Sequence, residues 1–159
     1  MLLQLIMILG IDPGLENTGW AVMDGVEKLE ECGVILTTTK QKSADRLVKI
    51  YNELEKIIKK YKMTEMAIET LFFAKNAKSA IKVSEAIGVI KLVGVKNGIG
   101  VAEYTPLQVK MALVGYGRAE KEQVEQMVRG CLGLDKPITP SHASDAVAVA
   151  LTHGFTMKV

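Results

Sequence analysis

The run Leu5-Ile6-Met7-Ile8-Leu9-Gly10-Ile11 is apolar throughout and stops abruptly at Asp12-Pro13-Gly14. A strand that is buried on both faces of a sheet shows such an unbroken run, whereas a strand with one solvent-exposed face alternates apolar and polar residues. Proline cannot donate to a strand ladder and glycine suits a tight turn, so the strand should end there. The stretch therefore predicts a central strand at residues 5–11 with a carboxylate at its carboxyl end.

The rest of the chain alternates between strand and helix patterns. Residues 18–24 and 28–38 are predicted to be strands joined by a hairpin at Asp24-Gly25. The further predicted elements are a helix over 43–61 capped by Ser43, a strand ending at Glu69, a helix over 76–96 and a strand over 100–104. Three more helices follow: one that begins at Pro106 with Thr105 as its cap, one over 119–132, and one capped by Ser141 that runs to about Thr152. This order predicts an α/β fold of the RNase H-like type, with a five-stranded mixed β-sheet flanked by α-helices on both faces.

The composition indicates one globular domain. Apolar residues make up 48% of the 159 residues, which is enough for a core and too much for a disordered chain. A net charge of +2 permits nucleic-acid binding only through a local basic patch. The two cysteines form no C-x-x-C pair, so a reducing cytoplasmic location fits and a zinc site does not. We expect a single RNase H-like domain over 1–159, in which 1–6 are a possible N-terminal extension, with no signal peptide and no membrane span.

The predicted helix over residues 76–96 is apolar on nearly all sides. A helix without a polar face must be covered on both sides, and the sheet can cover only one of them. A second copy of the chain would supply the other cover and make a homodimer. Another helix of the same chain would do so equally well, and the sequence leaves both possibilities open.

Three acidic residues stand at informative places. Asp12 ends the first strand, Glu69 ends the fourth, and Asp145 lies on the last helix, one turn after His142. Like charges about 4 Å apart repel by roughly 4 kcal/mol at an effective dielectric near 20, so such a cluster needs cations. Mg²⁺ prefers oxygen ligands, and a pair of such ions can promote phosphodiester hydrolysis. Each acid alone also has a structural explanation, as a turn residue, a surface residue or a first-turn helix residue.

Four motifs in series resemble those of the RuvC family of crossover (Holliday) junction endodeoxyribonucleases. The match covers roughly residues 7–154. The first motif alone is weak, whereas the series of four is specific. The matching stretches are Gly10-Ile11-Asp12-Pro13-Gly14 with Thr18-Gly19, Ala67-Ile68-Glu69 with Phe72 and Ala74-Lys75-Asn76-Ala77, Gln108-Val109-Lys110 with Ala119-Glu120-Lys121 and Met127-Val128, and Ala143-Ser144-Asp145-Ala146-Val147-Ala148-Val149-Ala150 with Thr152-His153.

The resemblance implies a role for each matched residue. Asp12, Glu69 and Asp145 would be catalytic carboxylates and metal ligands, holding Mg²⁺ (or Mn²⁺), with two ions per active site. Phe72 would stack on an unpaired base at the junction centre, and Lys110 and Lys121 would hold the scissile phosphate. Arg118 is a further candidate phosphate contact, by its proximity in sequence only.

Position 142 departs from the family pattern, which usually has a fourth carboxylate there. His142 is expected in the first turn of a helix, where the helix dipole disfavours an imidazolium. A neutral ring can bind a metal or orient a water molecule, so His142 is included among the catalytic and metal-binding candidates. His153, near the expected end of the same helix, is interpreted as structural.

Three functions compete. The favoured one is a structure-selective endonuclease that resolves four-way DNA junctions by paired, metal-dependent hydrolysis in homologous recombination and DNA repair. A homodimer through the helix over 76–96 would present two active sites to two strands, so paired cuts would follow from its symmetry. The resemblance also implies a branch-migration helicase as partner. An actin-like ATPase or sugar-kinase fragment is the second, although such folds need two similar domains. A junction-binding protein that has lost catalysis is the third.

Overall fold

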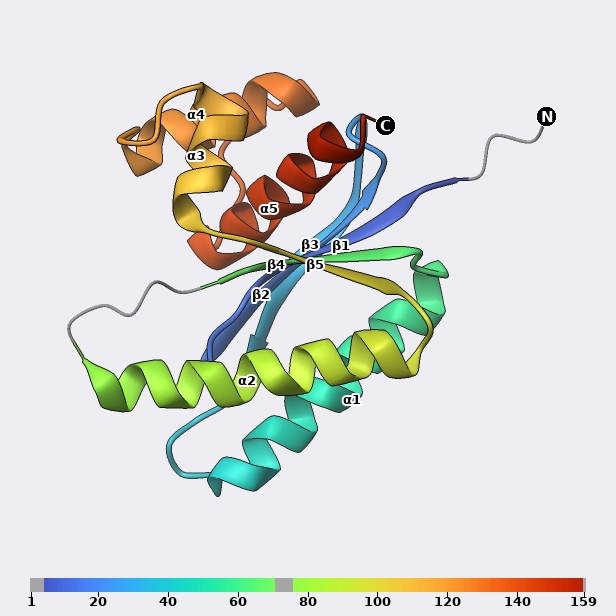
Figure 1. Cartoon of the computed structure of the whole chain (residues 1–159), viewed down its shortest axis with the longest axis vertical. Helices are drawn as coiled ribbons and strands as arrows, with labels where there is room; N and C mark the ends of the chain where they lie inside the picture. The colour runs from blue at the N-terminus through green and yellow to red at the C-terminus, as the bar shows by residue number, and fades with distance from the viewer. Residues whose placement is uncertain (1–4, 71–75, 159) are drawn as a thin grey trace.

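The computed structural model describes residues 5–70 and 76–158, and its centre is a five-stranded sheet in the order β3-β2-β1-β4-β5 (Figure 1). β1 pairs antiparallel with β2 and parallel with β4, so the sheet is mixed. The strands are β1 (Met7–Asp12), β2 (Asn17–Asp24), β3 (Lys28–Leu36), β4 (Glu65–Glu69) and β5 (Gly100–Tyr104). The helices are α1 (Ser43–Tyr61), α2 (Ala77–Lys96), α3 (Pro106–Val114), α4 (Lys121–Leu132) and α5 (Ser141–Met157).

The central strand β1 is buried on both faces, as its apolar run predicts. Leu9 and Ile11 belong to the core between the sheet and α1 and α2, whereas Ile8 belongs to the core beneath α5. All three side chains are fully buried. Because side chains alternate along a strand, only a strand covered on both sides gives this pattern.

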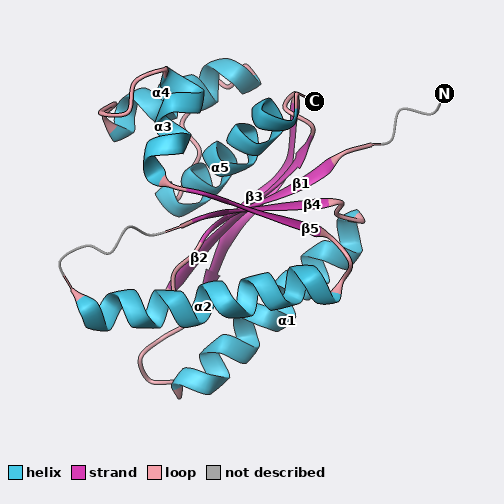
Figure 2. Ribbon diagram, viewed as in Figure 1, coloured by secondary structure: helices cyan, strands magenta, loops and turns pink. Residues whose placement is uncertain are grey.

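The helices lie in two layers on opposite faces of the sheet (Figure 2). α1 and α2 cover one face, while α5 crosses the other with α3 and α4 outside it. The predicted α/β fold, with a five-stranded mixed sheet between helices, is therefore confirmed. No helix within the described residues is long and apolar enough to cross a membrane.

Two predicted helix caps are wrong by one residue. Ser43 and Ser141 are the first helical residues, and the cap positions belong to Lys42 and Pro140, whose side chains make no capping hydrogen bond. Thr105 is confirmed as a cap, since it accepts from the backbone N–H of Gln108 in a reciprocal capping box. The last helix also continues past the expected end, to Met157.

α2 is covered by the sheet on one side and only partly on the other. Ala86, Ile90 and Val93 are buried in the core, and α1 packs beside the helix. Helix α1 of the same chain thus covers part of the side of α2 that the sheet leaves open. Ile81, Leu92 and Val95 nevertheless remain 60%, 59% and 65% exposed, so an apolar strip of α2 is left open.

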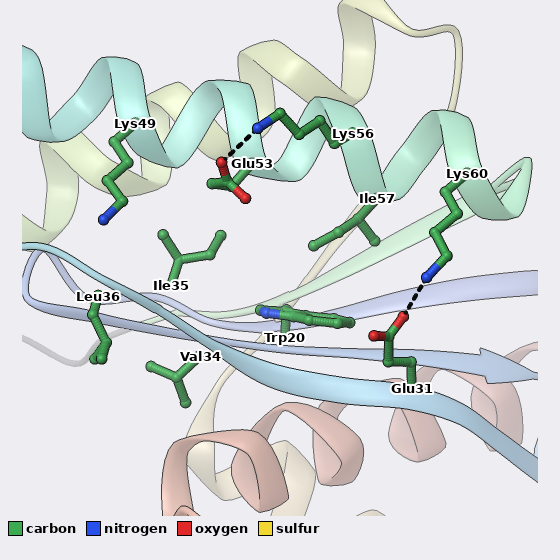
Figure 3. Close-up of a pocket in the computed structure, with 10 residues that line it drawn as sticks. All are labelled: Trp20, Glu31, Val34, Ile35, Leu36, Lys49, Glu53, Lys56, Ile57 and Lys60. Atoms are coloured by element: carbon green, nitrogen blue, oxygen red, sulfur yellow. Dashed lines mark hydrogen bonds and ion pairs between the residues drawn. The ribbon is translucent and has the colours of Figure 1, made fainter.

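A groove of about 440 Å³ lies between α1 and the outer strands β2 and β3 (Figure 3). Trp20 forms its floor and lies against Gly33 of the edge strand, where a Cβ would come within 3.0 Å of the indole ring. Lysines of α1 line its rim. Lys56 pairs with Glu53 at 2.8 Å, and Lys60 pairs with Glu31 at 3.0 Å. The charges of Lys56 and Lys60 are therefore largely balanced by neighbouring carboxylates.

His153 joins three elements in the core beneath α5. Its Nδ1 lies 2.7 Å from the Tyr104 hydroxyl of β5, and its Nε2 lies 3.5 Å from Glu65 Oε2 of β4. Burial lowers the pKa of His153, although Glu65 opposes the shift. The helix end therefore does not favour a cation here, because α5 runs four residues further and the ring is buried.

This lowered pKa predicts an acid-sensitive contribution to stability. As the pH drops below about 6.5, the unfolded chain takes up a proton on this residue before the folded chain does. The free energy of unfolding therefore decreases as the pH decreases. His153→Gln should remove this contribution. Urea unfolding of both proteins at about pH 7.5 and pH 5.5 checks it, and a wild type that loses no more stability than the variant would contradict it.

Candidate metal centre

Two carboxylates meet where neighbouring parallel strands end. Ile11 of β1 pairs with Ile68 of β4, so Asp12 and Glu69 follow at the same edge of the sheet. Such edges are where ligand and active sites form in α/β proteins, because loops and helix ends converge there. The strand pairing therefore makes these two residues neighbours.

Close backbone contact brings the start of α5 to this edge. A Cβ on Gly10 of β1 would lie 2.1 Å from the Ala146 carbonyl, and a Cβ on Gly19 of β2 would lie 2.0 Å from the His142 carbonyl. Both positions therefore require glycine. The sequence shows these glycines inside the first motif, but only the fold shows that α5 packs directly against them.

α5 places two further ligand atoms beside Asp12. His142 Nδ1 lies 2.8 Å from Asp12 Oδ2, and Asp145 is one helical turn further on. One ligand atom each from Asp12, His142 and Asp145 lie within 4.8 Å of one another. Glu69 is not in this group of three. The hydrogen bond between His142 and Asp12 could not be foreseen from the sequence.

The acidic groups repel one another in a poorly solvated place. Burial, followed by the charges of Asp12 and Asp145, raises the pKa of Glu69 to about 7. Burial also raises the pKa of Asp12, with Asp145 adding to the shift and His142 opposing it. The negative charge at this edge is therefore under-compensated within the protein.

Two of the predicted lysines border the same site. Lys121 Nζ lies 2.9 Å from Asp145 Oδ2, and this hydrogen bond raises the pKa of Lys121. Lys110 and Lys121 line a cavity of about 260 Å³ together with Glu69 and Asp145. Both lysines also lower the pKa of Glu69, which places their charges close to it.

Of the remaining two candidates, only Arg118 lies within the described residues, and it does not join this cluster. Arg118 lies exposed in the turn between α3 and α4, and within the described part of the chain it makes no ion pair. Phe72 lies outside the described residues. Their predicted contacts with DNA remain predictions.

The residues of the site suit a hard divalent cation. Asp12, Asp145 and His142 bring their ligand atoms together, and Glu69 ends the neighbouring strand. Burial, with repulsion from neighbouring carboxylates added to it, raises the pKa of both Glu69 and Asp12. A divalent ion takes such oxygen ligands and removes the repulsion, whereas an apolar ligand would not. The donor set thus fits the implied metal.

The sheet order defines an RNase H-like α/β protein, and its acidic edge is a candidate metal site. The model of the family "Crossover junction endodeoxyribonuclease RuvC" matches residues 8–153. The chain therefore belongs to the crossover junction endodeoxyribonuclease RuvC family. Family membership favours a nuclease over the fragment of an ATPase or sugar kinase.

Relatives of this name span most of the chain. One from Fusobacterium nucleatum is 45% identical over 92% of this chain and 78% of its own length. One from Roseiflexus sp. is 47% identical over 92% of this chain and 89% of its own length. The structure "T. thermophilus RuvC in complex with Holliday junction substrate" matches with a TM-score of 0.91 and 34% identity, covering 96% of this chain and 95% of that one.

Glu69→Gln should stabilise the metal-free protein. Between about pH 4.5 and 7 the folded chain keeps a proton on Glu69 that the unfolded chain has released, so stability falls as pH rises. A shift of this size corresponds to about 3 kcal/mol at most. Thermal melting in EDTA should show a higher Tm for the variant at about pH 8 and no gain near pH 4.5. Equal melting at pH 8 would mean that Glu69 is not under electrostatic strain.

Gly19→Ala should displace the start of α5 and weaken metal binding as well as stability. The added Cβ meets a backbone carbonyl, which cannot move aside without the helix. Gly130→Ala in α4 is the matched control, because a Cβ there meets nothing within 4 Å and alanine favours a helix. Mn²⁺ titration and thermal melting of both variants check this. Unchanged Mn²⁺ affinity in Gly19→Ala would contradict the seating role.

Proposed function

We propose that this protein is a structure-selective endonuclease that cleaves four-way DNA junctions by divalent-metal-dependent phosphodiester hydrolysis, in recombination and repair. The observation that carries the proposal is the convergence of Asp12, His142 and Asp145 within 4.8 Å at the end of the central strand. Family membership supports the reaction, and the matched complex from T. thermophilus supports the substrate.

Asp12, Glu69, His142 and Asp145 are the residues that would hold the metal, with Mg²⁺ preferred, Mn²⁺ accepted, and two ions per active site. When bound, such ions generate a nucleophilic water and stabilise the leaving oxygen of the phosphodiester. As a ligand Asp12 would be a carboxylate, so His142 would donate to it from Nδ1, which leaves Nε2 as the ring nitrogen suited to ligation. Its bond to Asp12 fixes the direction of both side chains.

The basic residues would bind the substrate. Lys110 and Lys121 border the acidic cavity, so a phosphate there would meet two cations at the place where charge develops. Lys121 can exchange Asp145 for a phosphate oxygen, since its side chain is 61% exposed. Arg118 would contact the DNA backbone further out, and Phe72 would stack on an unpaired base at the junction centre.

We also propose a homodimer that is formed through α2. The exposed Ile81, Leu92 and Val95 give this helix an apolar strip that α1 leaves open. A two-fold pair would present two active sites to two strands, and paired cuts would follow from that symmetry. The chain would act as one domain over 1–159, with 1–6 as an extension, in the cytoplasm and beside a branch-migration helicase.

The central test compares a synthetic mobile four-way junction with a linear duplex of equal length, in Mg²⁺, Mn²⁺ or EDTA. Asp12→Asn should reduce cutting by at least 100-fold while leaving junction binding intact, because it removes a metal ligand charge. Paired, metal-dependent cuts in the junction alone would support the proposal. Binding without cutting in either metal would favour a junction-binding protein that has lost catalysis.

A further inference from the structure

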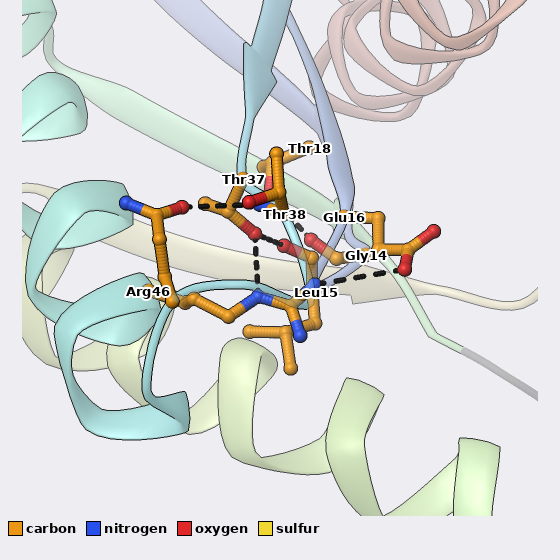
Figure 4. Close-up of polar contacts among 8 residues, drawn as sticks. Gly14, Leu15, Glu16, Thr18, Thr37, Thr38 and Arg46 are labelled. Carbon is orange, nitrogen blue, oxygen red and sulfur yellow. Dashed lines mark hydrogen bonds and ion pairs between the residues drawn. The ribbon is translucent and has the colours of Figure 1, made fainter.

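In the turn that follows Asp12, three consecutive backbone carbonyls accept hydrogen bonds (Figure 4). The Gly14 carbonyl accepts from the Thr18 hydroxyl at 2.6 Å, and the Leu15 carbonyl accepts from the Thr37 hydroxyl at 2.5 Å. The next carbonyl, of Glu16, accepts from the backbone N–H of Thr37 at 2.9 Å. The backbone directly after a proposed metal ligand is thereby fixed to β2 and to the residue that follows β3.

Arg46 of α1 determines which way the Thr37 hydroxyl points. Its Nε donates to Thr37 Oγ1 at 2.8 Å. A hydroxyl has one proton, and an oxygen that accepts from a guanidinium must send that proton elsewhere. The proton of Thr37 is therefore directed to the Leu15 carbonyl. A continuous chain of hydrogen bonds runs from α1 to the turn behind Asp12.

Arg46 is poorly suited to a purely stabilising role. The residue is 4% exposed, and one of its terminal nitrogens, Nη2, has no hydrogen-bond partner among the described residues. The nearest carboxylate, Glu16 Oε1, is 3.9 Å from Nη2 and belongs to a side chain that is 61% exposed. A buried cation with an unused donor and a distant counter-ion lowers stability relative to a packed apolar residue.

We propose that Arg46 and Thr37 are positioning residues that act through the turn over residues 13–17 to hold Asp12 in the orientation needed for metal binding. The inference rests on the proposed function of Asp12 as a metal ligand. Hydrogen-bond partners that orient metal ligands typically change metal affinity or activity 10–100-fold when they are removed. Here the orienting group acts on the ligand's backbone rather than on its carboxylate.

Mn²⁺ affinity without DNA is the decisive measurement, by calorimetric titration at a temperature well below unfolding. Thr37→Val and Arg46→Met should each weaken binding by roughly 10-fold. Thr37→Ser, which keeps the hydroxyl, should restore it. Arg46→Lys should not, because a lysine lacks the Nε–H that meets Thr37. On the junction, Thr37→Val should lower kcat and leave the substrate affinity unchanged.

Leu54→Ala is the matched control for lost stability. Leu54 is a fully buried core residue of the same helix, so its truncation should lower the Tm without changing Mn²⁺ affinity. If Thr37→Val binds Mn²⁺ as tightly as the wild type, or if Leu54→Ala weakens binding as much, the positioning role is overturned. A wild type that binds no Mn²⁺ would overturn the proposed metal site and this inference together.

Discussion

The whole site depends on one contact, the approach of the α5 backbone to β1 and β2 at Gly10 and Gly19. Without side chains at these two positions, the helix lies directly on the sheet and its first turn reaches the end of β1. A helix held further away by even one methyl group would carry Asp145 and His142 away from Asp12. The apolar burial of α5 over 143–154 supplies the driving force, while the two glycines set the distance.

The second constraint is electrostatic. Carboxylates gather where water is scarce, and the raised pKa of Glu69 records the resulting strain. Lys121 offsets part of it through Asp145, and Lys110 acts from the cavity wall. A divalent ion would offset this repulsion more effectively than the two lysines do. The energetic penalty of gathering these carboxylates and the affinity of the cluster for a divalent ion therefore have the same cause.

Much of the fold could be predicted from the sequence because its strongest patterns are local. The apolar run before Asp12 indicates a central strand, and the order of elements restricts the sheet to a few topologies. The helix caps at Ser43 and Ser141 were misplaced by one residue, since propensity alone does not resolve the last residue of a turn. Asp12 and Glu69 could be selected because each ends a strand, and Asp145 because it lies near the start of the last helix, one turn after His142. The bonds of Asp12 to His142 and of Thr37 to Arg46 could not, because partners 130 and 9 residues apart in chain order leave no periodic trace.

The order of the elements has a consequence for how the protein acquires activity. The proposed ligands come from β1, β4 and α5, and α5 follows every strand in the chain. A chain that has made only its sheet therefore holds two of the acidic groups and cannot assemble the site. During synthesis, the nascent protein would stay inert towards DNA until its last helix is free to dock. Nuclease activity would therefore appear only after this helix has docked on the sheet.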